Sequence, residues 1–255
     1  MQSVEIGDVM GTMIGTFIKT AAPEVVEILG LTGLDFLAVD AEHAPFGRRE
    51  LDLMMLAARA VGLPMYVRIP DDRPTTILQT LDVGASGLIV PHVDSAAQAV
   101  AVVRSAKFAD GDRGFSNAAR FGRYGTTTID QAVELGDQAQ IICQIESPQA
   151  VAAADAIAAT PGVSGLLVGR ADLALSMGLR KLDADEVAQG ARTAISAARK
   201  HGKLAGIVAG DVSELPAWLA AGADFFIIAH DQGILRKAAA AVATSARAAI
   251  ADAAK

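Results

Sequence analysis

Short apolar runs recur along the chain, separated by longer segments in which apolar residues recur with helical spacing. Eight runs have the length and composition of strands, at residues 13–18, 35–40, 65–69, 87–93, 141–146, 165–169, 204–208 and 224–229. The segments between them, such as RRELDLMMLAARAVG at 48–62, have the periodicity of amphipathic helices. The pattern predicts strands that alternate with helices.

This alternation indicates a parallel sheet, because parallel neighbours need a crossover connection that a helix supplies. Eight strand–helix repeats in 255 residues predict an α/β fold, a single (β/α)8 TIM barrel over residues 1–255. An open doubly wound sheet is the alternative, but no GxGxxG or Walker-type loop follows the first apolar run, and no Pro/Ser-rich linker divides the chain. The Ala-rich residues 234–255 predict an extended C-terminal helix.

Composition narrows the class of protein. The chain is 52% hydrophobic and 20% charged, which suits a large core, and its net charge of −7 argues against nucleic acid as a partner. No run approaches the roughly 18 apolar residues of a membrane span, and the first residues lack a secretory signal. The single cysteine, Cys143, cannot form an internal disulfide. We therefore expect a cytoplasmic protein without membrane or nucleic-acid partners.

The predicted strands are apolar, but most of their C-terminal ends are polar. In (β/α)8 barrels the chemistry lies at this end of the strands. The polar residues expected at this mouth are Asp40, Glu42, His43, Arg68, His92, Gln144, Glu146, Asp172, His230 and Asp231.

Two carboxylates at the mouth are candidate metal ligands. Gln144 and Glu146 lie two residues apart and so project to the same side of the sheet, where a buried carboxylate needs a cation or a proton. Asp172 follows the next strand. Two carboxylates with positions left for water and substrate suit Mg²⁺, Mn²⁺ or Co²⁺. The alternative is that Glu146 pairs with an arginine and Asp172 caps a helix.

Arg68 and His43 are candidates for charge stabilisation and proton transfer. Arg68 ends an apolar strand, where its guanidinium can bind a carboxylate or a developing oxyanion, or form a structural ion pair. Asp40 lies three residues before His43, so its carboxylate can orient the imidazole for proton transfer near neutral pH. Glu42 can instead hold a metal-bound water or a backbone amide.

Several segments resemble, in order, the signature segments of the class II pyruvate-dependent aldolases, the HpcH/HpaI aldolase family of 4-hydroxy-2-oxoheptanedioate and 2-dehydro-3-deoxyglucarate aldolases. They are GLDFLAVDAEHAPF, VRIP with LDVGASGLIVPHV, RGFS with AARFGR, QIES and GVSGLLVGRADLALSMG. The resemblance covers nearly the whole chain. It implies a carbon–carbon lyase that reversibly cleaves 4-hydroxy-2-oxo acids to pyruvate and an aldehyde through a metal-stabilised pyruvate enolate.

The resemblance also implies how pyruvate is held. Glu146 and Asp172 correspond to ligands of a divalent metal, with no organic cofactor, and Gln144 lies near that metal. Arg68 corresponds to the residue beside the keto oxygen of pyruvate. The backbone amides of Ala171 and Asp172 correspond to those that bind its carboxylate.

Proton transfer and assembly are implied in the same way. His43, supported by Asp40, corresponds to the proton-transfer residue. Asp82 resembles a position contributed near the active site, often across a subunit boundary. Members assemble as hexamers built from dimers with exchanged C-terminal helices, so a homo-oligomer is expected here.

One motif departs from the family pattern. The chain has Gly169-Arg170-Ala171-Asp172 where the family commonly has Gly-Pro-Ala-Asp. Losing the proline either loosens the backbone amides or lets Arg170 reach a distal group of the substrate.

Three other functions compete with this interpretation. A Schiff-base aldolase needs a lysine on a strand, but the lysines lie outside the predicted strands, with Lys19 and Lys203 flanking them. A citramalyl- or malyl-CoA lyase-like enzyme needs a site for a nucleotide thioester. A non-catalytic pyruvate-binding barrel needs no proton-transfer pair.

Overall fold

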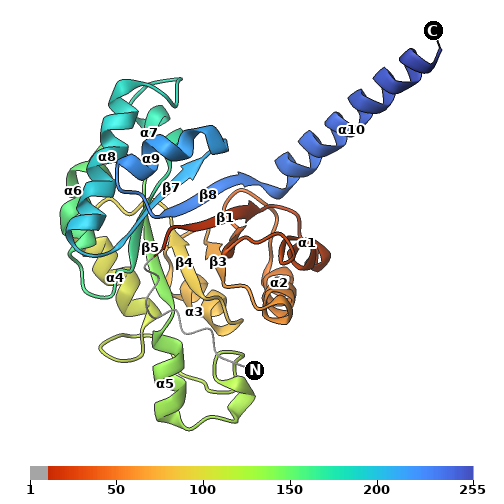
Figure 1. Cartoon of the computed structure of the whole chain (residues 1–255). Helices are drawn as coiled ribbons and strands as arrows, with labels where there is room; N and C mark the ends of the chain where they lie inside the picture. The colour runs from red at the N-terminus through yellow and green to blue at the C-terminus, as the bar shows by residue number, and fades with distance from the viewer. Residues whose placement is uncertain (1–10, 255) are drawn as a thin grey trace.

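The computed structural model describes residues 11–254 and contains a closed barrel of eight parallel strands (Figure 1). The strands are β1 Met13–Ile18, β2 Phe36–Asp40, β3 Met65–Arg68, β4 Gly87–Val90, β5 Gln140–Ile145, β6 Gly165–Val168, β7 Leu204–Ala209 and β8 Phe225–His230. Each strand pairs with the next along the chain, and β8 pairs with β1. The predicted (β/α)8 barrel is therefore confirmed. The prediction about a secretory signal concerns residues 1–10, outside the described range.

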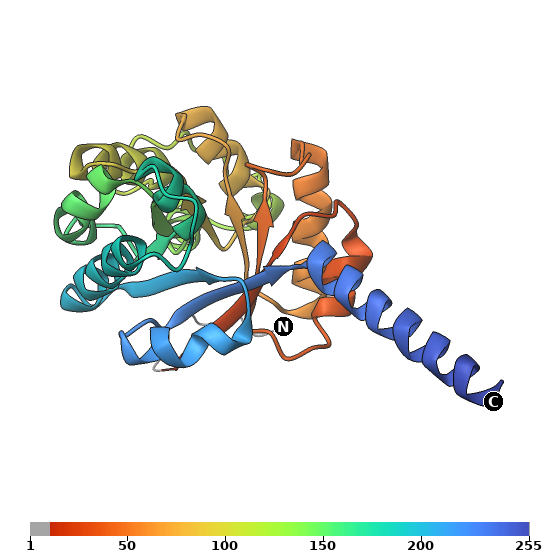
Figure 2. The same cartoon turned by 90° about the horizontal axis from the view of Figure 1, so that it is seen from above.

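Helices lie outside the ring of strands (Figure 2). They are α1 Pro23–Leu29, α2 Arg48–Val61, α3 Pro74–Asp82, α4 Ala96–Ala106, α5 Ile129–Asp137, α6 Pro148–Ala158, α7 Arg170–Ser176, α8 Asp185–Lys200, α9 Leu215–Ala220 and α10 Asp231–Ala253, with short 3₁₀ helices η1 Arg123–Gly125 and η2 Val212–Glu214. Within residues 11–254, no helix is both long and apolar enough to cross a membrane.

Three aromatic side chains fill the interior of the barrel below its mouth. Phe36 stacks on Phe225 with 4.2 Å between ring centroids, and Tyr66 meets both rings edge-on at 5.4 and 5.5 Å. The Tyr66 hydroxyl donates a hydrogen bond to Gln140 Oε1 at 2.5 Å, which satisfies the buried phenol. This layer closes the floor beneath the charged residues.

Glycines on the adjacent, paired strands make room for these rings. A Cβ placed on Gly15 would lie 2.5 Å from the Phe36 ring, and one on Gly87 would lie 2.9 Å from the Tyr66 ring. Large and small residues therefore alternate around the interior, as close packing requires.

Strand β4 is shorter than the sequence predicted. It ends at Val90, because Pro91 has no backbone N–H and His92 adopts a left-handed conformation with φ of 56°. This turn directs His92 back toward the mouth.

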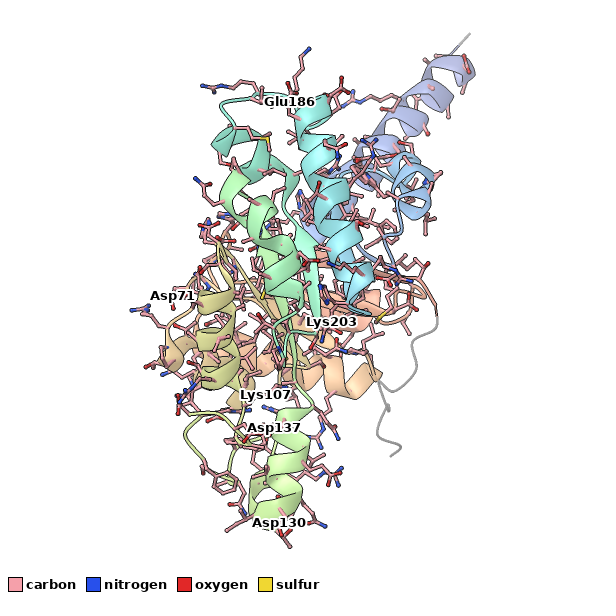
Figure 3. All side chains as sticks on the ribbon, turned by 90° about the vertical axis from the view of Figure 1, so that its left-hand side faces the viewer. Asp71, Lys107, Asp130, Asp137, Glu186 and Lys203 are labelled. Carbon is pink, nitrogen blue, oxygen red and sulfur yellow. The ribbon has the colours of Figure 1, made fainter. Side chains whose placement is uncertain are left out.

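Residues 107–139 depart from the simple repeat, as expected. Lys107 Nζ donates hydrogen bonds to the backbone carbonyls of Asp137 at 2.5 Å and Ala139 at 2.7 Å (Figure 3). The guanidinium of Arg113 lies 4.4 Å from the Phe108 ring centroid and 4.5 Å from that of Phe121. These contacts join the C-terminal end of α5 to the C-terminal end of α4.

The extended C-terminal helix is also confirmed. Helix α10 runs away from the barrel in both views (Figures 1 and 2), and its residues 234–253 are exposed. Ile234, Leu235, Val242 and Ile250 are the large apolar side chains that it exposes.

We predict that Gly15→Ala lowers the free energy of unfolding by about 1–3 kcal/mol, because the added methyl group overpacks the interior against Phe36. Urea unfolding followed by circular dichroism measures this change. Gly11→Ala is the matched control, since a Cβ there meets nothing within 4 Å. Equal stability of the two variants would contradict this account of the barrel floor.

Candidate active site

A buried ion-pair cluster joins the ends of β1, β2 and β3. The fully buried Asp40 carboxylate accepts a hydrogen bond of 3.0 Å from Arg68 Nε at Oδ1 and forms an ion pair of 2.8 Å with Arg68 Nη2 at Oδ2. Lys19 Nζ lies 2.5 Å from the same Oδ2. One carboxylate thus faces two cations, and this charge arrangement orients the Arg68 guanidinium.

The protonation of Asp40 reflects these partners. Burial alone would raise the pKa of its carboxyl group, but the hydrogen bonds and positive charge of Arg68, together with Lys19, outweigh burial and lower the pKa from 3.8 to about 2. Asp40 is therefore ionised at neutral pH.

Arg68 is held from two further sides. Its guanidinium carbon lies 4.6 Å from the centroid of the Phe17 ring, and its Nε lies 3.3 Å from Glu42 Oε2. Within residues 11–254, Nη1 of Arg68 has no hydrogen-bond partner. This nitrogen is available to an oxygen of a bound molecule.

The expected side-chain dyad of Asp40 and His43 is wrong in its geometry. Asp40 Oδ1 accepts a hydrogen bond of 3.1 Å from the backbone N–H of His43, while both carboxylate oxygens are occupied by Arg68 and Lys19. The acid closest to the imidazole is Glu42, whose Oε2 lies 3.6 Å from His43 Nε2. The His43 side chain is 54% exposed, so its ring faces the open mouth.

Glu146 is buried just beyond β5 and has two partners. Gln144 Nε2 donates a hydrogen bond to its Oε2, so the two side chains project to the same side of the sheet, as their spacing predicted. Its Oε1 accepts the backbone N–H of His92 at 2.7 Å and lies 2.8 Å from His92 Nδ1. The alternative of an arginine partner for Glu146 is not what the structure shows.

His92 connects the two halves of the mouth, a role that sequence reasoning missed. Its Nε2 lies 3.5 Å from Glu42 Oε1, so the ring bridges Glu42 and Glu146. Burial and the negative charge of Glu146 raise the pKa of Glu42. The positive charges of Arg68, His43 and His92 lower it by less, so the pKa of Glu42 is raised overall. The only sequence signal was a histidine directly after Val-Pro at the end of a strand.

The residues proposed as metal ligands suit an oxygen-preferring divalent ion. Asp172 lies half-buried in the first turn of α7, next to the end of β6. Gly169 leaves a small space beside Glu146, where a Cβ would lie 3.1 Å from Oε2, and the buried Oε1 of Gln144 has no hydrogen-bond partner in residues 11–254. The same range contains no group of three or more His, Cys, Asp or Glu side chains arranged to hold a metal. The donors here are thus carboxylate and amide oxygens, the ligand type that such ions prefer.

Ala171 and Asp172 are the second and third residues of α7, which begins at Arg170. Backbone N–H groups in the first turn of a helix have no intrahelical partner. Their amides are thus free to bind an anion at the mouth, as the family resemblance implies.

Arg170 does not reach toward a substrate, contrary to one expectation. Its guanidinium donates hydrogen bonds to the backbone carbonyl of Val208 and to Glu214, and it stacks 5.3 Å from the centroid of Trp218. The side chain is only 8% exposed. Arg170 therefore ties α7 to α9.

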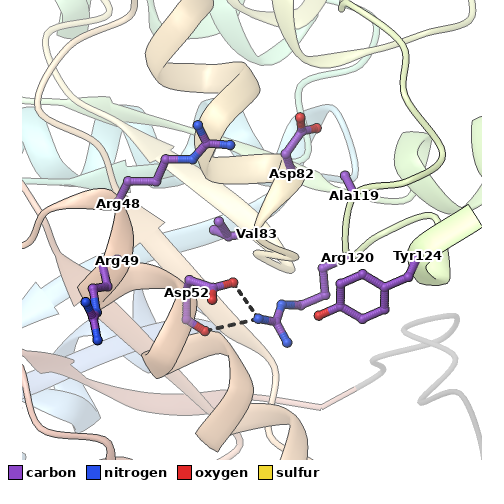
Figure 4. Close-up of a pocket in the computed structure, with 8 residues that line it drawn as sticks. All are labelled: Arg48, Arg49, Asp52, Asp82, Val83, Ala119, Arg120 and Tyr124. Atoms are coloured by element: carbon purple, nitrogen blue, oxygen red, sulfur yellow. Dashed lines mark hydrogen bonds and ion pairs between the residues drawn. The ribbon is translucent and has the colours of Figure 1, made fainter.

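Asp82 lies apart from the other candidates. It ends α3 and forms an ion pair of 2.9 Å with Arg113, whose side chain is almost completely buried. Asp82 also lines a surface hollow of about 550 Å³ in which Arg120 pairs with Asp52 (Figure 4). Within one chain, the structure does not bring Asp82 to the mouth.

A closed parallel barrel with acidic, basic and imidazole side chains at the C-terminal ends of its strands is the arrangement of (β/α)8-barrel enzymes. The profile of the family described as HpcH/HpaI aldolase/citrate lyase matches residues 13–238. The chain belongs to this family, as its motifs predicted.

Known relatives agree with this assignment. The chain is 36% identical over 227 residues to a 5-keto-4-deoxy-D-glucarate aldolase of Klebsiella pneumoniae, with 88% of each chain covered. A family protein from Burkholderia cenocepacia J2315 is 30% identical with a TM-score of 0.89, covering 93% of this chain and 95% of that one. An HpcH/HpaI aldolase from Desulfitobacterium hafniense DCB-2 is 27% identical with a TM-score of 0.87, covering 93% of each. These relatives confirm the prediction of a carbon–carbon lyase.

We predict that Asp40→Asn lowers the free energy of unfolding at pH 7 by about 3 kcal/mol, because it leaves Arg68 and Lys19 without their shared anion. The pKa of Asp40 is lower in the folded chain than in the unfolded one. Its ionised form therefore stabilises the fold above about pH 4 by about 2 kcal/mol, and this contribution disappears as the pH falls toward 2.

Urea unfolding of both proteins at several pH values between 7 and 2 measures this difference. Asp71→Asn is the control: Arg73 lowers the pKa of Asp71 to about 2 as well, but this pair lies at the surface. The control is expected to change stability by less than about 1 kcal/mol. A gap between wild type and Asp40→Asn that stays constant down to pH 2 would contradict the assignment.

Proposed function

We propose that this enzyme is a divalent-metal-dependent aldolase that reversibly cleaves 4-hydroxy-2-oxo acids to pyruvate and an aldehyde. The observation that carries the proposal is one mouth in which Arg68, held by Asp40, contacts Glu42, while Glu42 contacts His43 and is bridged by His92 to Glu146, in a chain of the aldolase family. The name of the Klebsiella relative makes 5-keto-4-deoxy-D-glucarate the first substrate to test.

The metal is proposed from the chemistry of its donors. Glu146 and Asp172 supply carboxylate oxygens, Gln144 has an unpartnered buried oxygen, and Gly169 leaves space beside them. Mg²⁺, Mn²⁺ and Co²⁺ accept such ligands with positions left open. A bound ion of this kind would act as a Lewis acid on the keto and carboxylate oxygens of pyruvate.

Arg68 stabilises negative charge as it develops on the keto oxygen. Its guanidinium is fixed by Asp40 before substrate arrives, so no reorganisation is needed during the reaction. Asp40 thus acts by positioning Arg68. The amides of Ala171 and Asp172 hold the pyruvate carboxylate at the start of α7.

His43 transfers the proton of the substrate 4-hydroxyl group. In the cleavage direction its exposed imidazole accepts this proton while the bond between C3 and C4 breaks and an aldehyde forms. Glu42 lies closer to the ring than Asp40 and so replaces it as the carboxylate partner of His43. In the synthetic direction His43 returns the proton to the new hydroxyl group.

We predict that the EDTA-treated protein exchanges the methyl protons of pyruvate in D₂O only after Mg²⁺ or Mn²⁺ is added, because enolate formation depends on the metal. Glu146→Gln should lower the exchange rate at least about 100-fold. Proton NMR of pyruvate measures the rate. Glu134→Gln, at an exposed position of α5, is the matched control and should exchange like the wild type.

Two results would contradict the proposal. Exchange that persists in EDTA and is stopped by borohydride in the presence of pyruvate would indicate a Schiff base. No exchange with any divalent ion, in a folded protein, would leave the thioester-lyase and pyruvate-binding functions.

We also propose that the enzyme is a homo-oligomer, expected to be a hexamer built from dimers and joined through α10. This helix exposes Leu235 and Val242 at 71% and 70%, seven residues apart and so on one face. An isolated helix gains little stability unless its apolar face is covered. In this oligomer, the barrel mouth of a neighbouring subunit is proposed to lie against the hollow at Asp82.

We predict that Leu235→Glu combined with Val242→Glu lowers the native mass, because it places charges in the apolar contact of α10. Light scattering after size-exclusion chromatography measures the mass. Thr244→Glu is the control, because residue 244 is exposed on the opposite face of the helix. A monomeric wild type, or an unchanged mass in the double variant, would contradict this assembly.

A further inference from the structure

We infer that Lys19 binds an anionic group at the end of the substrate remote from pyruvate, so that this enzyme selects aldehydes that carry a carboxylate. The inference rests on the proposed aldolase function and assigns a residue to its substrate specificity.

The ammonium group of Lys19 has hydrogen-bond donors that Asp40 does not use. Arg68 already contacts both oxygens of the Asp40 carboxylate, so Lys19 is a second cation on one anion. A lysine ammonium group has three donors, and within residues 11–254 Asp40 is the partner found for Nζ. Glu42, the next carboxylate in the cluster, contacts Arg68, His43 and His92 instead.

Lys19 is also the more accessible of the two cations. Its side chain is 23% exposed, while that of Arg68 is 8% exposed. An anion that enters the mouth can therefore reach Lys19 without displacing the Asp40–Arg68 pair.

Lys19 shares Asp40 Oδ2 with Arg68, but it lies on the side of the ring away from the proposed ligands Glu146 and Asp172. Glu146 and Asp172 follow β5 and β6, and in a closed ring of eight strands β1 lies across from β5. Going round the ring from these ligands, Arg68 ends β3, His43 follows β2 and Lys19 follows β1. In the proposed binding mode, the keto acid of the substrate lies at Glu146, Asp172 and Arg68, and its 4-hydroxyl group lies at His43. The remaining carbons are then directed toward Lys19.

The backbone of Lys19 is held in place. Its N–H donates to Asp231 Oδ1 at 2.9 Å, and the N–H of Thr20 donates to Oδ2 of the same buried carboxylate at 3.0 Å. Gln232 Nε2 donates to the carbonyl of Lys19 at 3.4 Å. Because Nζ is also paired with Asp40, the side chain is already restricted before an anion binds, which reduces the entropy lost on binding.

Paired aldehydes of equal length test this inference in the synthetic direction with pyruvate. The pairs are succinic semialdehyde with butanal, and glyoxylate with acetaldehyde. The wild type should have a higher kcat/KM for the carboxylated member of at least one pair, and Lys19→Met should lower that preference about 10- to 100-fold. Lys19→Arg should retain most of it, and Lys203→Met is the control at a lysine outside the mouth.

A chemical rescue tests the charge within one protein. Lys19→Cys can be treated with 2-bromoethylamine, which rebuilds a lysine-like side chain through a sulfur atom. The other cysteine, Cys143, is fully buried, and burial raises the pKa of its thiol to about 12, so it stays unmodified. The treatment should restore the preference for the carboxylated aldehyde.

The outcomes separate the two proposals. Absence of pyruvate proton exchange in the wild type sinks the aldolase function and the inference with it. With exchange present, three results overturn the inference alone: no preference for carboxylated aldehydes in the wild type, equal losses on both members of a pair in Lys19→Met, or no rescue by aminoethylation.

Discussion

The buried carboxylate of Asp40 is the constraint on which the mouth of this barrel depends. A charge that is fully removed from water must be paired, because its desolvation is costly. Asp40 meets this need with Arg68 and Lys19 from the two neighbouring strands, and its Oδ1 also holds the backbone of His43. One side chain therefore sets the direction of the guanidinium, the place of the lysine and the turn that carries the imidazole.

A second buried carboxylate organises the opposite side of the mouth in the same way. Glu146 is paired with Gln144 on its own strand and with His92 from the turn after β4. His92 also reaches Glu42, so the two acidic groups are connected through one ring. The aromatic floor of Phe36, Tyr66 and Phe225 lies beneath both clusters and removes water from one side of them. This environment strengthens the charge interactions of the buried Asp40 and Glu146 carboxylates.

The strands were predictable because their signal is local. Residues 36–40 are all buried, because a parallel strand of a barrel is covered on both faces and so appears as a continuous apolar run. The repeat of such runs at regular distances defines the barrel. The polar ends of the strands could also be assigned to the mouth from topology alone. The partners of each side chain could not be assigned in this way, because a shift of about an ångström decides which groups form a hydrogen bond or an ion pair. Sequence spacing thus suggested Asp40 for the His43 ring, while the structure places Glu42 there.

Conformations set by single residues were beyond the sequence for a related reason. Nothing in the sequence before Val93 indicates that His92 takes a positive φ and turns toward Glu146. Arg170 was a candidate for reaching a distal group of the substrate because it replaces the proline of the family's Gly-Pro-Ala-Asp motif. Its position depends on Trp218 and Glu214, which come from a distant part of the chain.

The start of α10 connects the chemistry of the mouth to the outside of the molecule. Asp231, the first residue of this helix, binds the backbone amides of Lys19 and Thr20, while twenty residues later the same helix is fully exposed. A rigid helix transmits a displacement along its axis, since its backbone hydrogen bonds resist bending. In the proposed oligomer, a subunit that covers the apolar face of α10 would therefore also restrain Asp231, which holds the backbone of Lys19. The proposed assembly and the proposed recognition of the aldehyde would then both depend on the buried carboxylate of Asp231, while the proposed proton-transfer and metal-binding residues follow β2, β5 and β6.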